Sequence, residues 1–154
     1  MKFSTIIMGA ALAATSASAQ KAIVKTNCQH PAIYVQSFPY DGSAPGPLTL
    51  LTPGDTFQED FHPSGSTIKI DTDKTLAHPL FFGYSFSSNP DYAYYELSSE
   101  WGNPFGKLHN ILTPGPGCEV FDCAAFDPTC YSRPEAKKVY GCPQPVDLSL
   151  TLCA

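Results

Sequence analysis

Six cysteines, five of them in the last third of the chain, constrain this sequence more than any other feature. The five lie between Cys118 and Cys153, and the sixth, Cys28, stands alone near the start. If every thiol is paired, as an oxidising compartment favours, an odd set of five requires Cys28 to bond with one of them. That bridge closes a loop of about 90 residues or more, which restricts the unfolded chain by about 4–5 kcal/mol in the chain-entropy model. We therefore expect the two ends of the domain to lie side by side.

The first nineteen residues are predicted to be a secretory signal peptide. Met1-Lys2 supplies a short positive region, residues 6–14 form an apolar segment too short to span a bilayer, and Ala17-Ser18-Ala19 fits the A-x-A cleavage pattern. Cleavage leaves residues 20–154, enough for one domain with a hydrophobic core but not for two. We therefore expect a secreted, extracellular protein that consists of a signal peptide, residues 1–19, and a single domain, residues 20–154.

Charge and hydropathy argue against two classes of partner. Without Lys2, eight basic and fourteen acidic residues remain, a net charge of about −6. No later segment approaches the roughly 20 apolar residues of a membrane span, and no basic patch suggests phosphate binding. We therefore expect no nucleic acid and no membrane as partners, and we expect the protein to be a monomer.

Periodicity predicts an all-β fold. Short apolar runs are separated by turns rich in proline and glycine. Val146 to Leu152 is the most regular alternation, and a period of two likewise places Ile68 and Ile70 inward and Lys69 outward. About eight strands without a repeat indicate a β-sandwich closed by joining its terminal strands. The expected strands are 22–26, 33–37, 48–51, 56–61, 67–71, 80–86, 92–97 and 146–152.

The connections between these strands are also predicted. Thr52-Pro53-Gly54-Asp55 has proline and glycine where a tight turn needs them, so we expect 48–51 and 56–61 to pair as a hairpin. Segments 80–86 and 92–97 are expected to form a hairpin with an aromatic face. Between Cys118 and Cys142 the sequence is irregular, and we expect a disulfide-tied loop region near the C-terminus rather than sheet.

Several segments, taken in order, resemble a known family. An opening strand that ends in Asn27-Cys28, the turn Leu51-Thr-Pro-Gly54 and the closing Leu150-Thr-Leu-Cys153 are similar to a small thaumatin-like sandwich. The chain more closely resembles the Blastomyces yeast-phase-specific protein family, secreted proteins of filamentous and dimorphic fungi, and the match covers nearly all of residues 20–154. Further matching segments are Ala22-Ile-Val24, Thr67-Ile-Lys-Ile-Asp71, Tyr94-Tyr-Glu-Leu-Ser98 and Asn103-Pro-Phe-Gly106.

The resemblance implies one disulfide directly. The first and last cysteines of thaumatin-like proteins are bonded, which implies Cys28–Cys153 and agrees with the parity argument. The remaining four cysteines can pair in three ways. Among these, the pairs that we expect are Cys118–Cys142 and Cys123–Cys130.

No catalytic residue, metal site or cofactor is predicted. Glycoside hydrolysis needs two carboxyl groups roughly 5–10 Å apart, but turn capping and surface ion pairing are the commoner roles of such residues. The histidines are scattered, and their spacing does not bring two or three of them to a carboxylate. The carboxylate pairs considered are Asp71/Asp73, Glu96/Glu100 and Glu59/Asp60, and the histidines are His30, His62, His78 and His109.

Aromatic residues are the strongest candidates for a binding surface. Exposed rings stack on sugars and anchor protein interfaces. Strands place alternate residues on opposite faces, so at least half of the rings are expected in the core, which is the commoner place for them. The rings considered are Tyr84, Tyr92, Tyr94, Tyr95 and Trp101. Tyr92, Tyr94 and Trp101 are the residues that could form one exposed row and bind a ligand.

Two functions are consistent with the sequence. The favoured one is a secreted, non-enzymatic binding or effector-like protein that acts at a cell wall or host interface, with a cell-wall polysaccharide or a host protein as its partner. The alternative is a small wall-active thaumatin-like enzyme or antifungal protein that acts on β-glucan. Because members of the resembled family are described as stage-associated or host-associated, without an agreed catalytic site, the resemblance itself implies no chemistry.

Overall fold

The computed structural model describes residues 20–30 and 32–154. The predicted signal peptide, residues 1–19, lies outside the described residues. Within the described ranges there is no helix, and hence none that could span a membrane. The strands are β1 (Lys21–Thr26), β2 (Ile33–Pro39), β3 (Thr49–Leu51), β4 (Thr56–Asp60), β5 (Ser66–Asp71), β6 (Leu80–Ser88), β7 (Asp91–Ser98), β8 (Asn110–Thr113), β9 (Phe121–Cys123), β10 (Tyr140–Pro143) and β11 (Leu148–Leu152).

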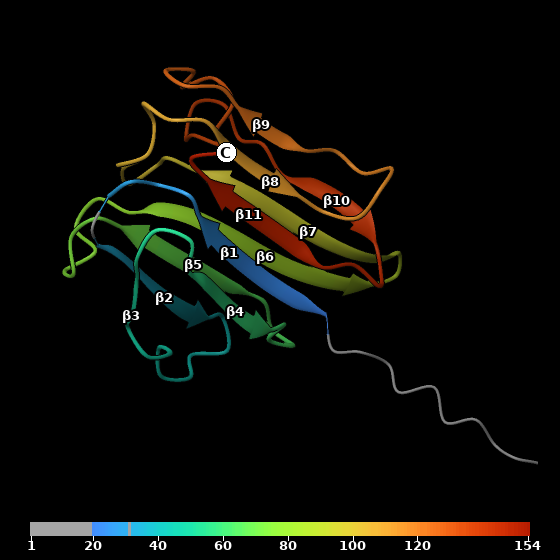
Figure 1. Cartoon of the computed structure of the whole chain (residues 1–154). Coiled ribbons are helices and arrows are strands. Elements are labelled where there is room, and N and C mark those ends of the chain that lie inside the picture. Colours follow the sequence, from blue (N-terminus) through green and yellow to red (C-terminus); the bar gives the residue numbers. More distant parts are fainter. Residues whose placement is uncertain (1–19, 31) are drawn as a thin grey trace, which may run out of the picture.

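These strands form two sheets that pack face to face (Figure 1). The five-stranded sheet has the order β4-β1-β11-β8-β9, and the six-stranded sheet has the order β10-β7-β6-β5-β2-β3. The predicted all-β sandwich is confirmed, but it has eleven strands rather than about eight. The predicted hairpin of 80–86 with 92–97 is present as β6 and β7.

The three additional strands lie in the last third of the chain. β8 pairs with β11, β9 pairs with β8, and β10 pairs with β7. The expectation of loop rather than sheet between Cys118 and Cys142 is therefore wrong in part, because β9 and the start of β10 fall within it. Each of the three strands has only three or four residues, too few to show a period of two in the sequence.

The two terminal strands are neighbours, as expected. β1 and β11 run parallel through the middle of the five-stranded sheet, with Val24 opposite Leu150 (Figure 1). Just beyond their ends, Cys28 and Cys153 form a disulfide with 5.0 Å between the two Cα atoms. The first and last strands of the described residues therefore lie in the same sheet, and one disulfide joins them just beyond their ends.

Two further disulfides fix the last third of the chain. Cys118–Cys142 joins the segment before β9 to β10, and so links the two sheets at one side of the sandwich. Cys123–Cys130 closes the short loop after β9. No cysteine is left free, so the structure contains the three pairs that the sequence analysis expects.

The predicted hairpin between 48–51 and 56–61 is wrong. β3 pairs with β2 in the six-stranded sheet, whereas β4 pairs with β1 in the five-stranded sheet. The turn itself has the expected local form, with Gly54 at a φ of 90°. However, the Gly54 N–H donates to the Thr26 carbonyl at 2.7 Å and the Thr26 N–H to the Asp55 carbonyl at 3.1 Å. These bonds anchor the turn to the end of β1, so it carries the chain from one sheet to the other.

Carboxylates that cap turns should make stability depend on pH. Asp55 accepts hydrogen bonds from the Thr52 N–H and hydroxyl at 2.8 and 2.7 Å, which lowers the pKa of Asp55. Threonines two residues further on lower the pKa of Asp73 and Asp127 in the same manner. A carboxyl whose pKa is lowered on folding stabilises the fold above its unfolded pKa, and this is lost as pH falls through the folded value. We therefore expect the Tm to fall as pH is lowered from about 5 to about 2.

A matched pair of variants tests this acid dependence. In Asp55→Asn the side chain no longer titrates, so the decrease in Tm on acidification should be smaller than in the wild type. Asp60→Asn is the control, because the exposed Asp60 side chain makes only a 3.9 Å ion pair with Lys21 and caps no turn. A Tm that stays constant or rises on acidification would contradict the prediction.

Alternation along the strands separates a core from an outer face. In β11 the leucines are fully buried, and in β5 Ile68 and Ile70 are fully buried while Lys69 between them is not. The same pattern in β7 buries Tyr95 and leaves Tyr94 half-buried on the opposite face. The outer side of the six-stranded sheet therefore consists of the strand residues that lie between the buried ones.

Candidate functional site

The outer side of the six-stranded sheet is rich in aromatic residues, and we call it the aromatic face. Lys69 lies opposite Phe81 across β5 and β6, Gly83 lies opposite Glu96 across β6 and β7, and Ser85 lies opposite Tyr94. Tyr40 follows β2, and Trp101 lies in the loop after β7. The residues that define the aromatic face are Phe38, Tyr40, Lys69, Phe81, Tyr92, Tyr94, Glu96 and Trp101.

A groove of about 540 Å³ lies on this face, within the usual size of small-ligand sites. Its floor is formed by outward residues of β2, β5 and β6, and its walls come from the 72–79 loop and from Trp101. Trp101 is 63% exposed and Tyr40 is 51% exposed. Lining residues are Phe38, Pro39, Tyr40, Thr67, Lys69, Leu76, Ala77, Pro79, Phe81 and Trp101.

Tyr40 separates this groove from a second, smaller depression. Its hydroxyl forms a 2.8 Å hydrogen bond with the Thr67 hydroxyl, and it lies over Gly83, where a Cβ atom would come within 3.3 Å of it. Partial burial raises the pKa of Tyr40, a change that Thr67 opposes and the nearby Glu96 carboxylate reinforces. Tyr40 therefore remains a neutral hydroxyl at physiological pH. The depression beyond it, of about 110 Å³, includes Tyr94, Glu96 and Val139.

Tyr92 and Tyr94 lie flat against the edge of the sheet. Their rings stack with 6.2 Å between centroids and 26° between planes. Both rings lie over Gly141 of β10, where an added Cβ atom would come within 3.2 Å of each ring. Because glycine leaves this space free, the two tyrosines form a flat aromatic platform.

The three residues predicted as a ligand site all lie toward the aromatic face, but not in one depression. Trp101 lines the large groove and Tyr94 lines the small depression, whereas Tyr92 is stacked on Tyr94 and lines neither. The other two rings considered, Tyr84 and Tyr95, are buried in the core. Burial raises the pKa of Tyr95 to about 12.

Sequence reasoning missed several members of the aromatic face. Phe38 lies in β2 and Tyr40 directly follows it, both beyond the expected strand 33–37, so their side of the sheet was not assigned. Lys69 was expected to face outward, and its outward partner Phe81 follows from the register of β5 and β6. That register requires knowing which strands are neighbours, and the sequence does not show this.

Gly102 fixes Trp101 against the neighbouring loop. It has a φ of 149°, and a Cβ atom there would overlap the backbone of His78. We therefore expect Gly102→Ala to move the Trp101 loop away from the 72–79 loop and to lower the free energy of unfolding by about 1–2 kcal/mol. Emission of Trp101, the only tryptophan, should change at the same time. Gly117→Ala is the control, since Gly117 has a positive φ but open space around it; equal effects on Trp101 emission would contradict the assignment.

Most of the carboxylates considered for catalysis have structural roles. Asp71 is buried and accepts hydrogen bonds from the backbone N–H groups of Thr72 and His78 at 2.7 and 2.9 Å. It thereby fixes the 72–79 loop that forms one wall of the groove. Glu100 pairs with Lys137, whereas Glu96 lies on the aromatic face.

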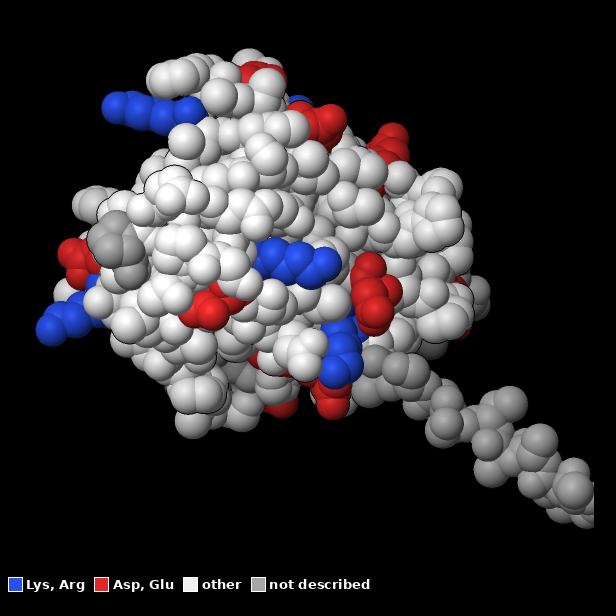
Figure 2. Space-filling model, viewed as in Figure 1, with Lys and Arg blue, Asp and Glu red and all other residues white. Residues whose placement is uncertain are grey.

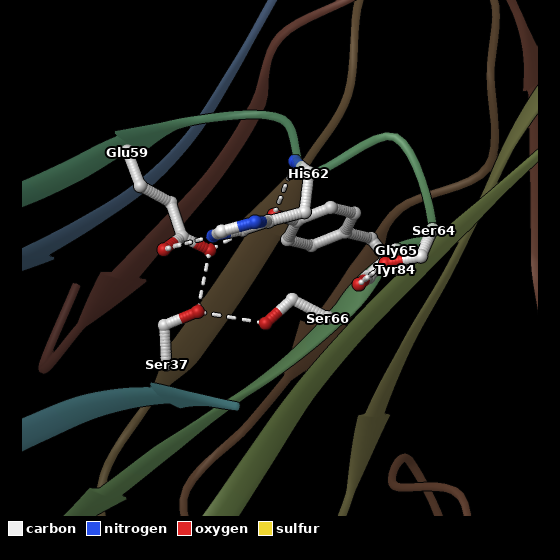
Figure 3. A network of polar contacts seen from close by, with 7 residues as sticks. All are labelled: Ser37, Glu59, His62, Ser64, Gly65, Ser66 and Tyr84. Carbon is white, nitrogen blue, oxygen red and sulfur yellow. Dashed lines mark hydrogen bonds and ion pairs between the residues drawn. The ribbon is translucent and has the colours of Figure 1, made fainter. Parts of the chain in front are cut away.

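Glu59 and Asp60 point to opposite sides of β4, so they do not form a carboxylate pair. Glu59 faces inward and accepts hydrogen bonds from Ser37 at 3.0 Å and from Tyr84 at 2.9 Å, while the His62 Nε2 atom lies 3.6 Å from its other oxygen. Ser66 extends this network through Ser37 (Figure 3). We call these residues the inter-sheet network, because Glu59 belongs to one sheet and Ser37, Ser66 and Tyr84 to the other.

Charge and possible metal ligands offer no further site on the described residues. Within 20–30 and 32–154, no group of three or more His, Cys, Asp or Glu side chains could hold a metal ion. Figure 2 shows charged side chains of both signs scattered among uncharged ones, without a continuous field of either sign on that side of the molecule. The visible surface therefore has no extended basic region for a phosphate backbone.

The fold first defines a class of protein, the small disulfide-bonded thaumatin-like sandwich. The structure of the thaumatin-like xylanase inhibitor TLXI is similar to this chain with a TM-score of 0.60, over 86% of this chain and 99% of that chain. The two sequences are 13% identical, so this similarity shows the fold alone.

The family follows from a closer match. A family model described as Blastomyces yeast-phase-specific protein matches residues 9–154, and the chain belongs to this family, as predicted from the sequence. The crystal structure of the protein elicitor MoHrip2 from Magnaporthe oryzae is similar with a TM-score of 0.85 and 65% sequence identity, over 88% of this chain and 100% of that chain. No curated protein sequence matches. An elicitor relative and three disulfides are consistent with an extracellular protein.

Proposed function

We propose that this chain is a secreted, non-enzymatic, elicitor-like binding protein, and that its aromatic face contacts a cell-wall polysaccharide or a host protein. The 65% identity with the elicitor MoHrip2 supports the elicitor-like activity. In this proposal residues 1–19 are removed on export, and residues 20–154 act as one extracellular domain.

The observation that carries the proposal is the exposure of large aromatic side chains on a rigid sheet. Trp101 and Tyr40 expose more than half of their surface, and Tyr92 and Tyr94 form the stacked platform elsewhere on the same face. Aromatic rings offer a large contact area at low cost in conformational entropy. Because the strands beneath them are paired on both sides and tied by a disulfide, these rings are held in position before a partner arrives.

A wall-active enzyme or antifungal protein that acts on β-glucan is the weaker proposal. Asp71 is committed to the 72–79 loop and Glu59 to the inter-sheet network. Each carboxylate is therefore already satisfied by hydrogen bonds that hold the fold, and glycoside hydrolysis would need one of them free, at about 5–10 Å from a second carboxyl group.

Two readouts on one pair of variants test the proposal. Wild-type protein and the Tyr94→Ala/Trp101→Ala variant would be infiltrated into plant tissue and the oxidative defence response measured. In parallel, retention on insoluble β-glucan and chitin would be measured together with released reducing sugar. Phe126→Ala is the matched control, because Phe126 is 72% exposed and lines none of the depressions on the aromatic face.

The proposal predicts a response, or retention without released sugar, that is reduced at least about fivefold in the double variant, as expected when aromatic anchors are truncated, and unchanged in the control. Released sugar that disappears in a Glu96→Gln variant would favour the enzyme. Equal activity of wild type and double variant would exclude the aromatic face as the contact surface.

A further inference from the structure

Of the residues that the structure describes, Lys69 is the only basic one that lines the large groove. It lies on β5 near the centre of the six-stranded sheet, between Gln36 of β2 and Phe81 of β6. Its ammonium lies 4.3 Å from the centroid of the Phe38 ring and 5.5 Å from that of Phe81. The positive charge is therefore held between two rings at the floor of the groove.

This charge has no acidic partner among residues 20–30 and 32–154. Among the described residues, no ion pair and no side-chain hydrogen bond involves the Lys69 ammonium. The neighbouring rings attract the ammonium through cation–π interactions. Since a lysine ammonium has three N–H donors, it can donate hydrogen bonds to an anionic group of a ligand in the groove.

The rest of the groove suits a flat, hydroxylated ligand. Trp101 and Tyr40 present aromatic surface, and the Tyr40 and Thr67 hydroxyls supply donors and acceptors. The wall of the groove that the 72–79 loop supplies is also formed before a ligand binds. Leu76 is held at a φ of 51°, which a branched side chain rarely adopts, and its N–H donates to the Asp73 carbonyl at 3.0 Å.

We propose that this groove binds a uronic-acid unit of an acidic polysaccharide, with the sugar carboxylate on Lys69 and the ring against Trp101 and Tyr40. The inference rests on the proposed function of the aromatic face and specifies its ligand class. The protein as a whole is acidic, so most of its surface repels an anionic ligand and the attraction is confined to an isolated cation such as Lys69. Glu96, which lies beyond Tyr40, disfavours a carboxylate on that side and so sets the orientation of the unit.

Two other ligand chemistries fit the groove less well. An extended peptide that adds to a sheet needs unpaired backbone groups at an edge, but β5 and β6 are central strands whose backbone is already paired on both sides. A phosphate group is usually bound by several basic residues or by an arginine fork, and the groove contains a single lysine. A carboxylate on a sugar ring matches both the single charge and the aromatic walls.

The emission of Trp101 reports on the groove, because it is the only tryptophan in the chain. Purified wild-type protein would be titrated with oligogalacturonate and with the same oligomer fully methyl-esterified, which removes the charge and keeps the sugar backbone. We expect the acid form to change the emission and to bind about tenfold more tightly than the ester, the usual worth of one charge-assisted hydrogen bond.

Three lysine variants locate the effect. Lys69→Met keeps much of the apolar stem and removes the charge, so it should bind the acid and ester forms equally, whereas Lys69→Arg should keep the preference. Lys25→Met removes the same charge from an exposed position on β1 and should retain the full preference. If wild type does not prefer the acid form, or if Lys25→Met loses the preference as Lys69→Met does, the inference is overturned. In that case, a defence response or a retention on neutral glucan or chitin that the Tyr94→Ala/Trp101→Ala variant loses would leave the proposed function standing. Equal activity of that variant and the wild type would overturn the proposed function as well.

Discussion

Replacing Cys28 and Cys153 by alanine is expected to lower the free energy of unfolding by about 4–5 kcal/mol. The two cysteines are 125 residues apart in sequence, so in the chain-entropy model their bond removes more freedom from the unfolded chain than either other bridge. The bond also holds the parallel strands β1 and β11 together at their ends. Equilibrium unfolding in guanidinium chloride, with each variant compared with wild type, measures the loss.

The Cys123→Ala/Cys130→Ala variant is the control for this prediction. Its bridge spans only 7 positions, and the same model gives a loss of about 2 kcal/mol. The ranking of the two variants tests whether the terminal disulfide stabilises the fold by restricting the unfolded chain. Equal losses, or a smaller loss for the terminal pair, would contradict that explanation.

Glu59→Ala should have the next largest effect, a loss of about 2–3 kcal/mol in the free energy of unfolding. The Glu59 side chain is only 14% exposed and accepts hydrogen bonds from Ser37 and Tyr84, which belong to the other sheet (Figure 3). Burial, more than any other cause, raises the pKa of Tyr84 well above its ordinary value, so its hydroxyl stays protonated and donates to Glu59. Removing the carboxylate leaves two buried hydroxyl groups without their acceptor.

Two neighbouring substitutions separate this effect from a general weakening of β4. Glu59→Gln keeps an acceptor oxygen and should lose less than Glu59→Ala. Asp60→Ala, one residue further on the exposed side of the strand, should change the free energy of unfolding by no more than about 0.5 kcal/mol. Urea unfolding of the three variants measures the difference, and an Asp60→Ala loss as large as that of Glu59→Ala would show that the inter-sheet network is not the cause.

The sequence predicted the fold correctly where a hydrophobic alternation was long or where disulfide pairing constrained the chain. The alternation that ends in Leu152 and the odd number of cysteines after Cys28 together indicated adjacent terminal strands, and the structure has them as β1 and β11. β8, β9 and β10 could not be predicted, because strands of three or four residues carry no period and exist only through pairing with distant neighbours. The wrong hairpin has a similar origin, since the turn at Gly54 is local but its anchoring to Thr26 is not.

For the candidate site, the sequence predicted only which side of its own strand each residue faces. Tyr94 and Lys69 were placed on the outward side of their own strands, since outward positions alternate with buried ones. Their membership in one surface depends on the strand order β7-β6-β5-β2, which no local pattern encodes. Tyr40 is central to the aromatic face because Gly83, on a different strand, leaves room for its hydroxyl.

Rigid scaffold and exposed rings together explain how such a small chain can recognise a partner. The Cys118–Cys142 disulfide and the inter-sheet network hold the two sheets together, and Asp71 and Gly102 position the loops on either side of the groove. The outer positions of the six-stranded sheet are then free to carry aromatic residues that packing does not require. Preorganised contact surfaces of this kind lose little conformational entropy on binding.

Hydroxyl-radical footprinting of the protein bound to intact plant cell-wall material, which presents both polysaccharides and wall proteins, tests the central claim most directly. Our account predicts that Tyr40, Tyr94 and Trp101 become protected from oxidation on binding, while the exposed side chains of Phe126 and Leu108 react as in the free protein. Protection of Phe126 or Leu108 with Tyr40, Tyr94 and Trp101 still reactive would contradict the aromatic face as the recognition surface.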